Sequence, residues 1–474
     1  MFFSATFNMR ECYPTFEKIY NMKIKIAALR LFLWFYISTT FVLFMLTFFL
    51  ILHKNNYSVG TTVVFFQAFV VNMLASALFH IIATIPYLIF LLIRSVIFDY
   101  KRNKIKGLLK GSLLKIFIPV MALFIGNSVL QSYRLSEVLD YTWDTSVENN
   151  FTKVNNYYSI DNKQRGIHVF NISENLEDIE QLKTNNFEWI TLAPFINQDN
   201  YNEPSLRLVS DDSYNNMLKH YKAIKEECDK YGIKIMLKPH IWLQSREKEK
   251  WRSDIKMESE EDWNTWFENY NETILKYAEL AEKLQLEQFC IGTELEATVY
   301  EKPDQWKTLI KRVKATYKGK LTYAANWDNE YKEVPFWDEL DYIGVQAYFP
   351  ISTKDDPTLL ELENYWRKHA EEIVLISSKY NKPILFTELG YKSIQGTSKK
   401  PWEWNGLKNM VSKISKREQL LCYQAFFNTI WEEPWFHGIH IWEWQGNGTS
   451  DGSNTNFTIE GKPSLNLIAK YFKI

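Results

Sequence analysis

The hydrophobic positions of the chain form two patterns that meet near residue 130. In the first part, long apolar stretches approach the length of a helix that spans a bilayer, and they cover residues 31–52, 61–93 and 113–130, the last with Lys115 near one end. The first stretch is too long for the apolar core of a usual secretory signal, and no small-residue cleavage site follows it. We therefore predict an N-terminal membrane region, residues 1–130, with about three transmembrane helices.

Basic residues flank these stretches unevenly. Five Lys and Arg residues precede the first stretch, Lys54 alone lies between the first and second, six lie between the second and third, and Arg134 alone occupies the twenty residues that follow. Because Lys and Arg accumulate in cytoplasmic loops, we expect the N-terminus in the cytoplasm. Residues after 131 are then expected on the extracytoplasmic side, and the lipid bilayer is an expected partner.

After a polar, Asn-rich linker over 131–165, short apolar runs alternate with amphipathic segments. The predicted strands are 166–171, 189–196, 233–243, 288–295, 321–327, 342–349, 383–389 and 438–444. The helix-like or short segments that follow them are 174–183, 213–231, 261–284, 304–317, 334–340, 358–380, 417–431 and 465–472. Continuous apolar runs indicate strands that are buried on both faces.

Eight such units predict an α/β domain over residues 166–474 with the fold of a (β/α)8 TIM barrel. An open doubly wound sheet is the structural alternative. It usually has fewer strands and a Gly-rich nucleotide-binding turn, which this sequence lacks.

Composition narrows the possible partners. The chain has 474 residues and a formal net charge of −1, so nothing attracts it as a whole to nucleic acid. Aromatic residues make up 16 % of it, which suits a surface that stacks on sugar rings as well as a large core. The four cysteines are far apart and no His-Glu-x-x-His motif occurs, so we expect no metal and no cofactor.

Polar and aromatic residues gather at the ends of six predicted strands. Glu294 closes the fourth strand and Glu388 closes the seventh, and in a barrel all strands end at one mouth. Two carboxylates that face each other across a mouth are what hydrolysis of a glycosidic bond requires. Glu296 is a weaker candidate than Glu294, because the chain is already leaving the barrel there.

Shorter polar groups at neighbouring strand ends are candidates for supporting roles. Tyr348, at the end of the sixth strand, can hydrogen-bond Glu388 and keep it ionised and oriented; packing at the rim is the alternative. Asn326 and His240 are suited to binding sugar hydroxyls. For His240 a purely structural role is an equal alternative.

Three tryptophans at strand ends are candidates for sugar stacking. Trp442 and Trp444 alternate along the eighth strand and are therefore predicted to point to the same side. One of them is expected to floor the cleft under the sugar at the cleavage point, and Trp327 is a similar candidate. Core packing of at least one of these rings is the alternative.

Four segments, taken together and in order, resemble glycoside hydrolase family 113. They are CIGTEL at 290–295, TYAANWD at 322–328, GVQAYFP at 344–350 and ILFTELGY at 384–391. That family consists of retaining (β/α)8 enzymes with β-mannanase as its characterised activity, and the resemblance covers residues 165–474. It implies that Glu294 is the acid/base and Glu388 the nucleophile. Many members of the wider clan carry Asn before the acid/base, where this chain has Thr293.

The sequence therefore predicts a membrane-anchored retaining glycoside hydrolase. Its expected partner is an oligo- or polysaccharide, a β-linked and mannose-containing glycan that it cleaves by a two-glutamate double displacement. A hydrolase of another β-hexoside such as β-glucan is one alternative, and a glycan-binding barrel without turnover is another. A membrane assembly protein whose function lies in residues 1–130 is a further alternative.

Overall fold

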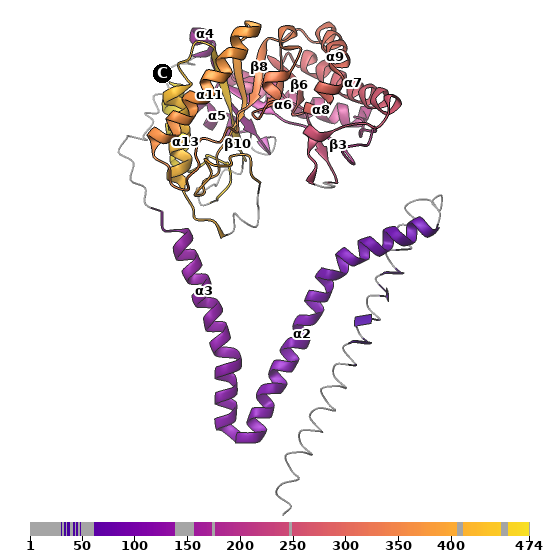
Figure 1. Ribbon diagram of the computed structural model, residues 1–474, viewed down its shortest axis with the longest axis vertical. Coiled ribbons are helices and arrows are strands. Elements are labelled where there is room, and N and C mark those ends of the chain that lie inside the picture. The colour runs from indigo at the N-terminus through magenta and orange to yellow at the C-terminus, as the bar shows by residue number, and fades with distance from the viewer. Residues whose placement is uncertain are drawn as a thin grey trace, which may run out of the picture. The chain divides into compact units, whose positions relative to one another are not determined.

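The chain forms two compact units, Met1–Val129 and Leu130–Ile474 (Figure 1). The computed structural model describes residues 61–137, 156–172, 176–245, 249–404, 411–446 and 454–473, with isolated positions between 30 and 48. The predicted span at 31–52 lies largely outside the described residues, as does most of the predicted linker at 131–165.

The first unit is helical in its described part. It comprises α2 (Thr61–Ser112), the π-helical turn η1 (Leu113–Phe117) and most of α3 (Ile118–Arg134). Helical geometry breaks inside α2 at Asn103 and Lys104. Beyond the break, Lys115 Nζ lies 2.5 Å from Asp99 Oδ2, so the lysine is paired across the bend. Gly107 permits this close approach, because a Cβ there would lie 1.9 Å from the Asp99 carbonyl oxygen.

One helical stretch among the described residues, Leu88–Arg134, has the length and mean hydropathy of a membrane-crossing segment. Its most apolar part is not buried within the structure. The stretch contains the predicted span at 113–130 and the end of the predicted span at 61–93. The number of crossings and their orientation stay predictions.

The second unit is a closed barrel of eight parallel strands, which confirms the predicted (β/α)8 fold. The strands are β1 (Gln164–Val169), β2 (Trp189–Leu192), β4 (Lys234–Leu237), β6 (Gln288–Thr293), β7 (Lys320–Asn326), β8 (Tyr342–Gln346), β9 (Ile384–Leu389) and β10 (Phe436–Trp444). Their order around the barrel is β1-β10-β9-β8-β7-β6-β4-β2. Nearly every strand residue is buried, which explains why the strands appear in the sequence as uninterrupted apolar runs.

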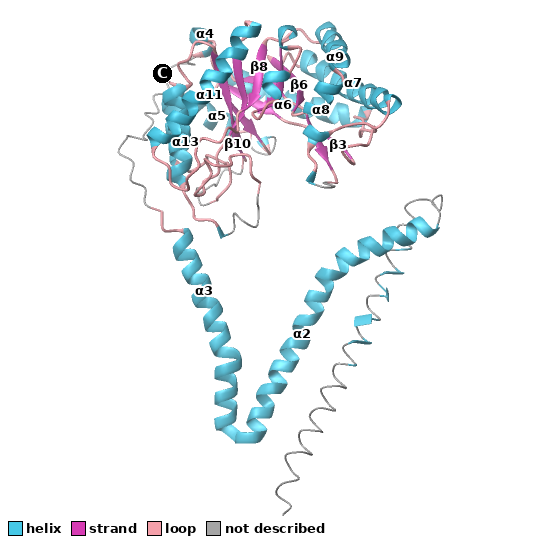
Figure 2. Ribbon diagram, in the orientation of Figure 1, coloured by secondary structure: helices cyan, strands magenta, loops and turns pink. Residues whose placement is uncertain are grey.

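Helices surround these strands on the outside (Figure 2). The described helices of the barrel domain, including short turns at its two ends, are α4 (Tyr158–Asp161), α5 (Asp178–Thr184), α6 (Asp211–Tyr231), η4 (Arg252–Asp254), α7 (Glu260–Lys283), α8 (Glu296–Glu301), α9 (Pro303–Thr316), α10 (Glu330–Glu333), η5 (Trp337–Glu339), α11 (Leu359–Tyr380), α13 (Lys416–Thr429) and α14 (Pro463–Phe472). Local signals set their ends: the Ser259 side chain accepts the Asp262 N–H at the start of α7, and Gly232 closes α6 at φ +66°.

Two predicted strands are wrong in extent. The run 189–196 divides into β2 and β3 (Phe195–Gln198), and the run 233–243 divides into β4 and β5 (His240–Leu243). Pro194 and Pro239 stand at the two breaks, and proline has no N–H to donate to a strand ladder. Beyond the prolines, β3 and β5 pair in parallel as a separate two-stranded sheet.

Candidate active site

Glu294 and Glu388 occupy the predicted ends of the fourth and seventh barrel strands. Glu294 follows β6 directly, and its N–H donates to the Ala324 carbonyl oxygen of β7 at 2.9 Å. Its φ of +53° is unusual for a residue with a side chain, and such strained conformations concentrate at functional sites. The carboxylate accepts the Trp251 indole N–H at 3.0 Å, and Arg252 Nε lies 3.7 Å from the same oxygen.

Glu388 lies on β9 and is almost completely buried. Its Oε1 lies 2.5 Å from Lys238 Nζ, and its Oε2 accepts the Tyr348 hydroxyl at 2.8 Å. Two imidazole nitrogens also face Oε1: His240 Nε2 at 3.7 Å and His168 Nε2 at 4.0 Å. The carboxylate therefore has a cation on one oxygen and a hydroxyl donor on the other, and both of its oxygens accept hydrogen bonds.

Lys238 supplies that cation from the segment that links β4 to β5. Its side chain is fully buried, and Nζ donates to Glu388 Oε1, Gln346 Oε1 and the Thr387 carbonyl oxygen. These three acceptors match the three N–H donors of an ammonium group. Burial lowers the pKa of Lys238, and the negative charge of Glu388 acts in the opposite direction.

His240 is held as a neutral imidazole. Burial lowers its pKa well below the usual range, and the nearby Lys238 and Arg252 charges act in the same direction. Arg252 Nη1 donates to His240 Nδ1 at 2.8 Å, so the ring proton is on Nε2, the nitrogen that faces Glu388. Arg252 therefore lies beside Glu294 and holds the histidine that lies beside Glu388. This chain of contacts connects the two carboxylates.

Tyr348 is a permanent donor to Glu388. Burial and the neighbouring negative charge raise the pKa of its hydroxyl well above the usual range. Its ring packs in a small buried cluster with Trp442 and Phe457. The Trp442 ring also lies 4.9 Å from the His168 ring and stacks at 17° to the His240 ring. Trp442 thus lies against the same histidines that surround Glu388.

Trp444 does not share the side of Trp442. It is buried in the main core, and its indole N–H donates to Asp178 Oδ2 at 3.2 Å. The predicted common direction is wrong because the ladder between β1 and β10 shifts: Ile167 pairs with Ile441 but Val169 pairs with Trp444. One extra residue in β10 breaks the alternation of its side chains. Core packing is the alternative that the structure favours for Trp444.

Asn326 and Trp327 lie at the end of β7. The Asn326 N–H donates to Glu330 Oε2 at 2.6 Å, and the Trp327 ring stacks on Trp402 at 4.7 Å. Both side chains are half-buried. Glu330, a fully buried carboxylate that accepts the Asn326 N–H, is not predicted from the sequence.

Glu443 is a third carboxylate near Glu388 that sequence reasoning missed. It is 4 % exposed, and its Oε1 accepts the Gln445 amide at 2.7 Å. Burial raises its pKa to about 7, and the negative charge of Glu388 acts in the same direction. The direction of the Glu443 side chain depends on the extra residue in β10. That extra residue is apparent only from the strand register in the structure and cannot be recognised in the sequence.

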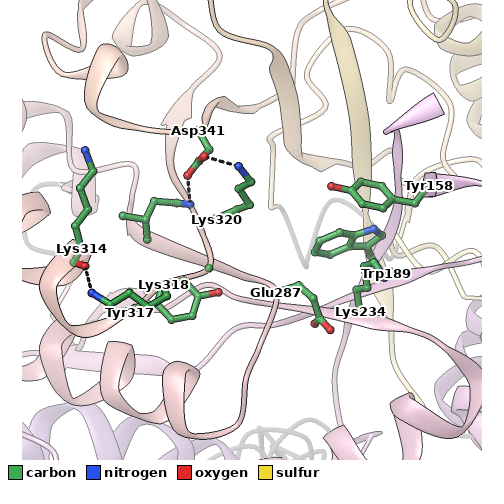
Figure 3. Close-up of a pocket in the computed structure, with 11 residues that line it drawn as sticks. Tyr158, Trp189, Lys234, Glu287, Lys314, Tyr317, Lys318, Lys320 and Asp341 are labelled. Atoms are coloured by element: carbon green, nitrogen blue, oxygen red, sulfur yellow. Dashed lines mark hydrogen bonds and ion pairs between the residues drawn. The ribbon is translucent and has the colours of Figure 1, made fainter. Parts of the chain in front are cut away.

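A separate depression of about 470 Å³ lies at the opposite end of the barrel (Figure 3). It is lined by residues that begin strands, among them Trp189 of β2, Lys234 of β4 and Lys320 of β7. Since Glu294 and Glu388 lie where strands end, this depression lies away from both candidate carboxylates. Within the described ranges, no group of three or more His, Cys, Asp or Glu side chains is arranged to hold a metal ion.

A closed (β/α)8 barrel with glutamates at the ends of its fourth and seventh strands has the architecture of a glycosidase. The model of Glycoside Hydrolase Family 113 matches residues 162–462, and the chain belongs to this family. The protein is therefore a glycosidase, and its substrate is a polysaccharide. Family membership also argues against a glycan-binding barrel without turnover.

Solved structures of related proteins agree with this assignment. The GH113 β-mannanase AaManA from Alicyclobacillus acidocaldarius, solved in complex with ManMIm, is 26 % identical, and the match covers 66 % of this chain and 97 % of that one with a TM-score of 0.56. A GH113 β-1,4-mannanase, solved as a complex, is 23 % identical over 66 % of this chain and 99 % of its own, with a TM-score of 0.56. None of the curated proteins compared with the chain matches it.

The contact between Lys238 and Glu388 generates one prediction. Lys238→Met leaves the buried carboxylate without its cation, and breaking a buried ion pair from one side costs about 3–5 kcal/mol. We expect the free energy of unfolding to fall by an amount of this order and kcat to fall strongly. Lys462→Met is the matched control, because Lys462 is also buried but donates to carbonyl oxygens and to the Thr458 hydroxyl rather than to Glu388. Equal kcat losses in the two variants would contradict the assigned role.

The pKa of Glu443 predicts a pH dependence of stability. Its folded-state pKa is about 7 against an ordinary 4.5, so its contribution to stability is present below pH 4.5 and is lost as the pH rises through 7. The loss is about 3 kcal/mol at most. We expect the Tm of the barrel to fall between pH 5 and pH 8, and to fall less in Glu443→Gln. Thermal unfolding of both proteins at both pH values tests this, and parallel Tm curves would exclude it.

Proposed function

We propose that the protein is a retaining β-mannanase in which Glu388 is the nucleophile and Glu294 the acid/base. The observation that carries this proposal is the different environment of the two carboxylates. Glu388 has a buried ammonium and a phenol as partners, which suits an ionised nucleophile. Glu294 has an indole N–H and a more distant guanidinium, and its position after β6 leaves it at the mouth.

The proposed reaction has two steps. Glu388 attacks the anomeric carbon and forms a glycosyl-enzyme, while Glu294 protonates the oxygen of the departing sugar. Glu294 then removes a proton from water, and the water oxygen displaces Glu388 with net retention. Lys238 and Tyr348 hold Glu388 in position, and Trp251 does the same for Glu294.

Mannan is the substrate that the relatives favour. The GH113 β-mannanase from Alicyclobacillus acidocaldarius is 26 % identical to this chain and matches over nearly its whole length. His240, Asn326 and Trp442 are proposed to contact the sugar at the cleavage point, since they come from strand ends around the two carboxylates. Trp327 is proposed to contact a neighbouring sugar. Another β-linked polysaccharide, such as β-glucan, is the alternative.

The N-terminal region is proposed to anchor the enzyme in a membrane. The exposed apolar stretch Leu88–Arg134 and the distribution of Lys and Arg support this role. The barrel would then act on glycans on the extracytoplasmic side. The contact between Lys115 and Asp99 lies in the segment that this topology places at the cytoplasmic face.

Removal of either carboxylate tests the proposed roles. Glu388→Ala should abolish hydrolysis of mannan and of aryl β-mannosides alike, because no glycosyl-enzyme forms. Glu294→Ala should lower kcat on mannan by about 10²–10⁴-fold, the usual contribution of a general acid. It should form the glycosyl-enzyme at a near-normal rate from an aryl mannoside with a very good leaving group, because that group needs no proton.

Glu296→Ala is the matched control, since Glu296 lies two residues beyond Glu294 and was the competing candidate. It should retain most of the activity. Normal mannan hydrolysis by Glu294→Ala or Glu388→Ala would exclude the proposed site. Hydrolysis of β-glucan but not mannan by the unmodified protein would keep the site and replace the substrate.

Membrane anchoring predicts a specific distribution in cells. The full chain, produced in a bacterial host, should remain in the membrane fraction after alkaline carbonate washing. Protease added to spheroplasts should remove the barrel while a cytoplasmic marker protein survives. A carbonate-soluble chain would contradict the anchor, and a protected barrel would contradict the orientation.

A further inference from the structure

The two-stranded sheet formed by β3 and β5 extends two barrel strands beyond the mouth. Its strands run in parallel, with Phe195 opposite His240 and Asn197 opposite Trp242. Residues two apart on a strand point to the same face, and residues paired across strands share a face. Phe195, Asn197, His240 and Trp242 therefore lie on one face of the sheet, which we call the aromatic face.

The other face of this sheet is buried in the barrel domain. Ile196, Ile241 and Leu243 belong to the main hydrophobic core, and Gln198 accepts the Trp266 indole N–H. The buried face therefore packs the sheet against the core of the barrel domain. Because the buried face stabilises the strands, side chains of the aromatic face can be exposed to solvent without destabilising the sheet.

The aromatic face is continuous with the candidate catalytic centre. At one end, His240 is 2 % exposed and its Nε2 lies 3.7 Å from Glu388 Oε1. Away from the centre, Phe195 is 44 % exposed and Trp242 is 37 % exposed. The Phe195 ring contacts both the His240 ring and the Trp242 ring, with centroids 5.9 Å and 5.6 Å apart.

A second connection leads from this face to Glu294. The Trp242 ring lies 6.2 Å from the Trp251 ring, and the Trp251 indole N–H holds the Glu294 carboxylate. Amide groups accompany the rings, because Asn197 lies beside Trp242 and accepts the Gln244 side-chain amide at 2.5 Å. Flat apolar rings with neighbouring amides match a sugar unit, which has an apolar C–H face and a hydroxyl rim.

We propose that the aromatic face of β3 and β5 is a saccharide-binding subsite for units next to the one at the cleaved bond. This inference rests on the proposed function and deepens it, because it assigns recognition of a chain rather than of a single sugar to named residues. Trp242 is the principal contact. Its ring makes edge-type contacts with the rings of Phe195 and Trp251, and more than a third of its surface faces solvent.

Substrate length provides the test. The full-length protein in detergent is assayed on mannohexaose and on 4-nitrophenyl β-mannoside, which has no further sugar to occupy the subsite. We expect Trp242→Ala to lower kcat/KM for mannohexaose about tenfold more than for the aryl mannoside, as truncation of an aromatic binding contact typically does. Trp242→Phe should recover most of the difference, because it keeps a ring at this position.

Leu375→Ala is the matched control. Leu375 is 66 % exposed on α11 and belongs neither to the site nor to the aromatic face, so its kinetics on both substrates should be unchanged. Equal loss on both substrates in Trp242→Ala would overturn the subsite, since it would mean that Trp242 acts only through Trp251 and Glu294. No loss on either substrate would also overturn it.

The same experiment separates this inference from the proposed function. If the unmodified protein hydrolyses no mannan substrate, the mannanase assignment fails, and the comparison is repeated on oligosaccharides of the β-linked polysaccharide that it does hydrolyse. If the unmodified protein is active but Trp242→Ala shows no dependence on substrate length, the subsite alone fails. A change in sedimentation without a length-dependent kinetic effect would assign the face to a second copy of the chain and overturn the proposal.

Discussion

A buried ion pair between Lys238 and Glu388 is the interaction on which the rest of the site depends. A carboxylate that is 4 % exposed inside a barrel is destabilised unless a charge and hydrogen bonds compensate for the lost water. Lys238 supplies the charge and Tyr348 supplies a hydrogen bond. Lys238 itself needs acceptors, and Gln346 and the Thr387 carbonyl oxygen provide them. Three strand ends are therefore tied together by the need to bury one negative charge.

The need to compensate buried charge also governs the groups between Glu388 and Glu294. These groups are not all charged at the same time. His240 and His168 both face Glu388, but burial and the Lys238 charge lower the pKa of each imidazole, so both stay neutral. Arg252 then acts as the second fixed cation, with one nitrogen on His240 and another near Glu294. The result is an ordered alternation of anion, neutral ring and cation between the two carboxylates.

The sequence predicts the barrel and the positions of both glutamates, because the same physical rule determines both. Strands buried on both faces must be continuous apolar runs, and the ends of those runs must meet at one mouth. Glu294 and Glu388 can be found from that rule alone. The hydrogen bond from Tyr348 to Glu388 is also predicted, because Tyr348 follows a strand end. The other partners, Lys238, Trp251 and Arg252, are not predicted, because they come from connecting segments whose paths depend on packing. Glu443 and the separation of Trp442 from Trp444 depend on one extra residue in β10, which changes the register without changing composition.

The prolines at 194 and 239 interrupt the strand pattern and thereby create the small sheet to which we assign a role in substrate binding. Continuous strands through these positions would have kept their side chains within the closed barrel. Each proline instead removes a ladder donor and separates the upper part of the strand, so β3 and β5 pair with each other above the barrel. That small sheet places His240 beside Glu388 and carries Phe195 and Trp242 outward from it. In the proposed function, one continuous surface serves both the chemistry at the mouth and the contact with a longer substrate, and its buried face packs against the same core that closes the barrel.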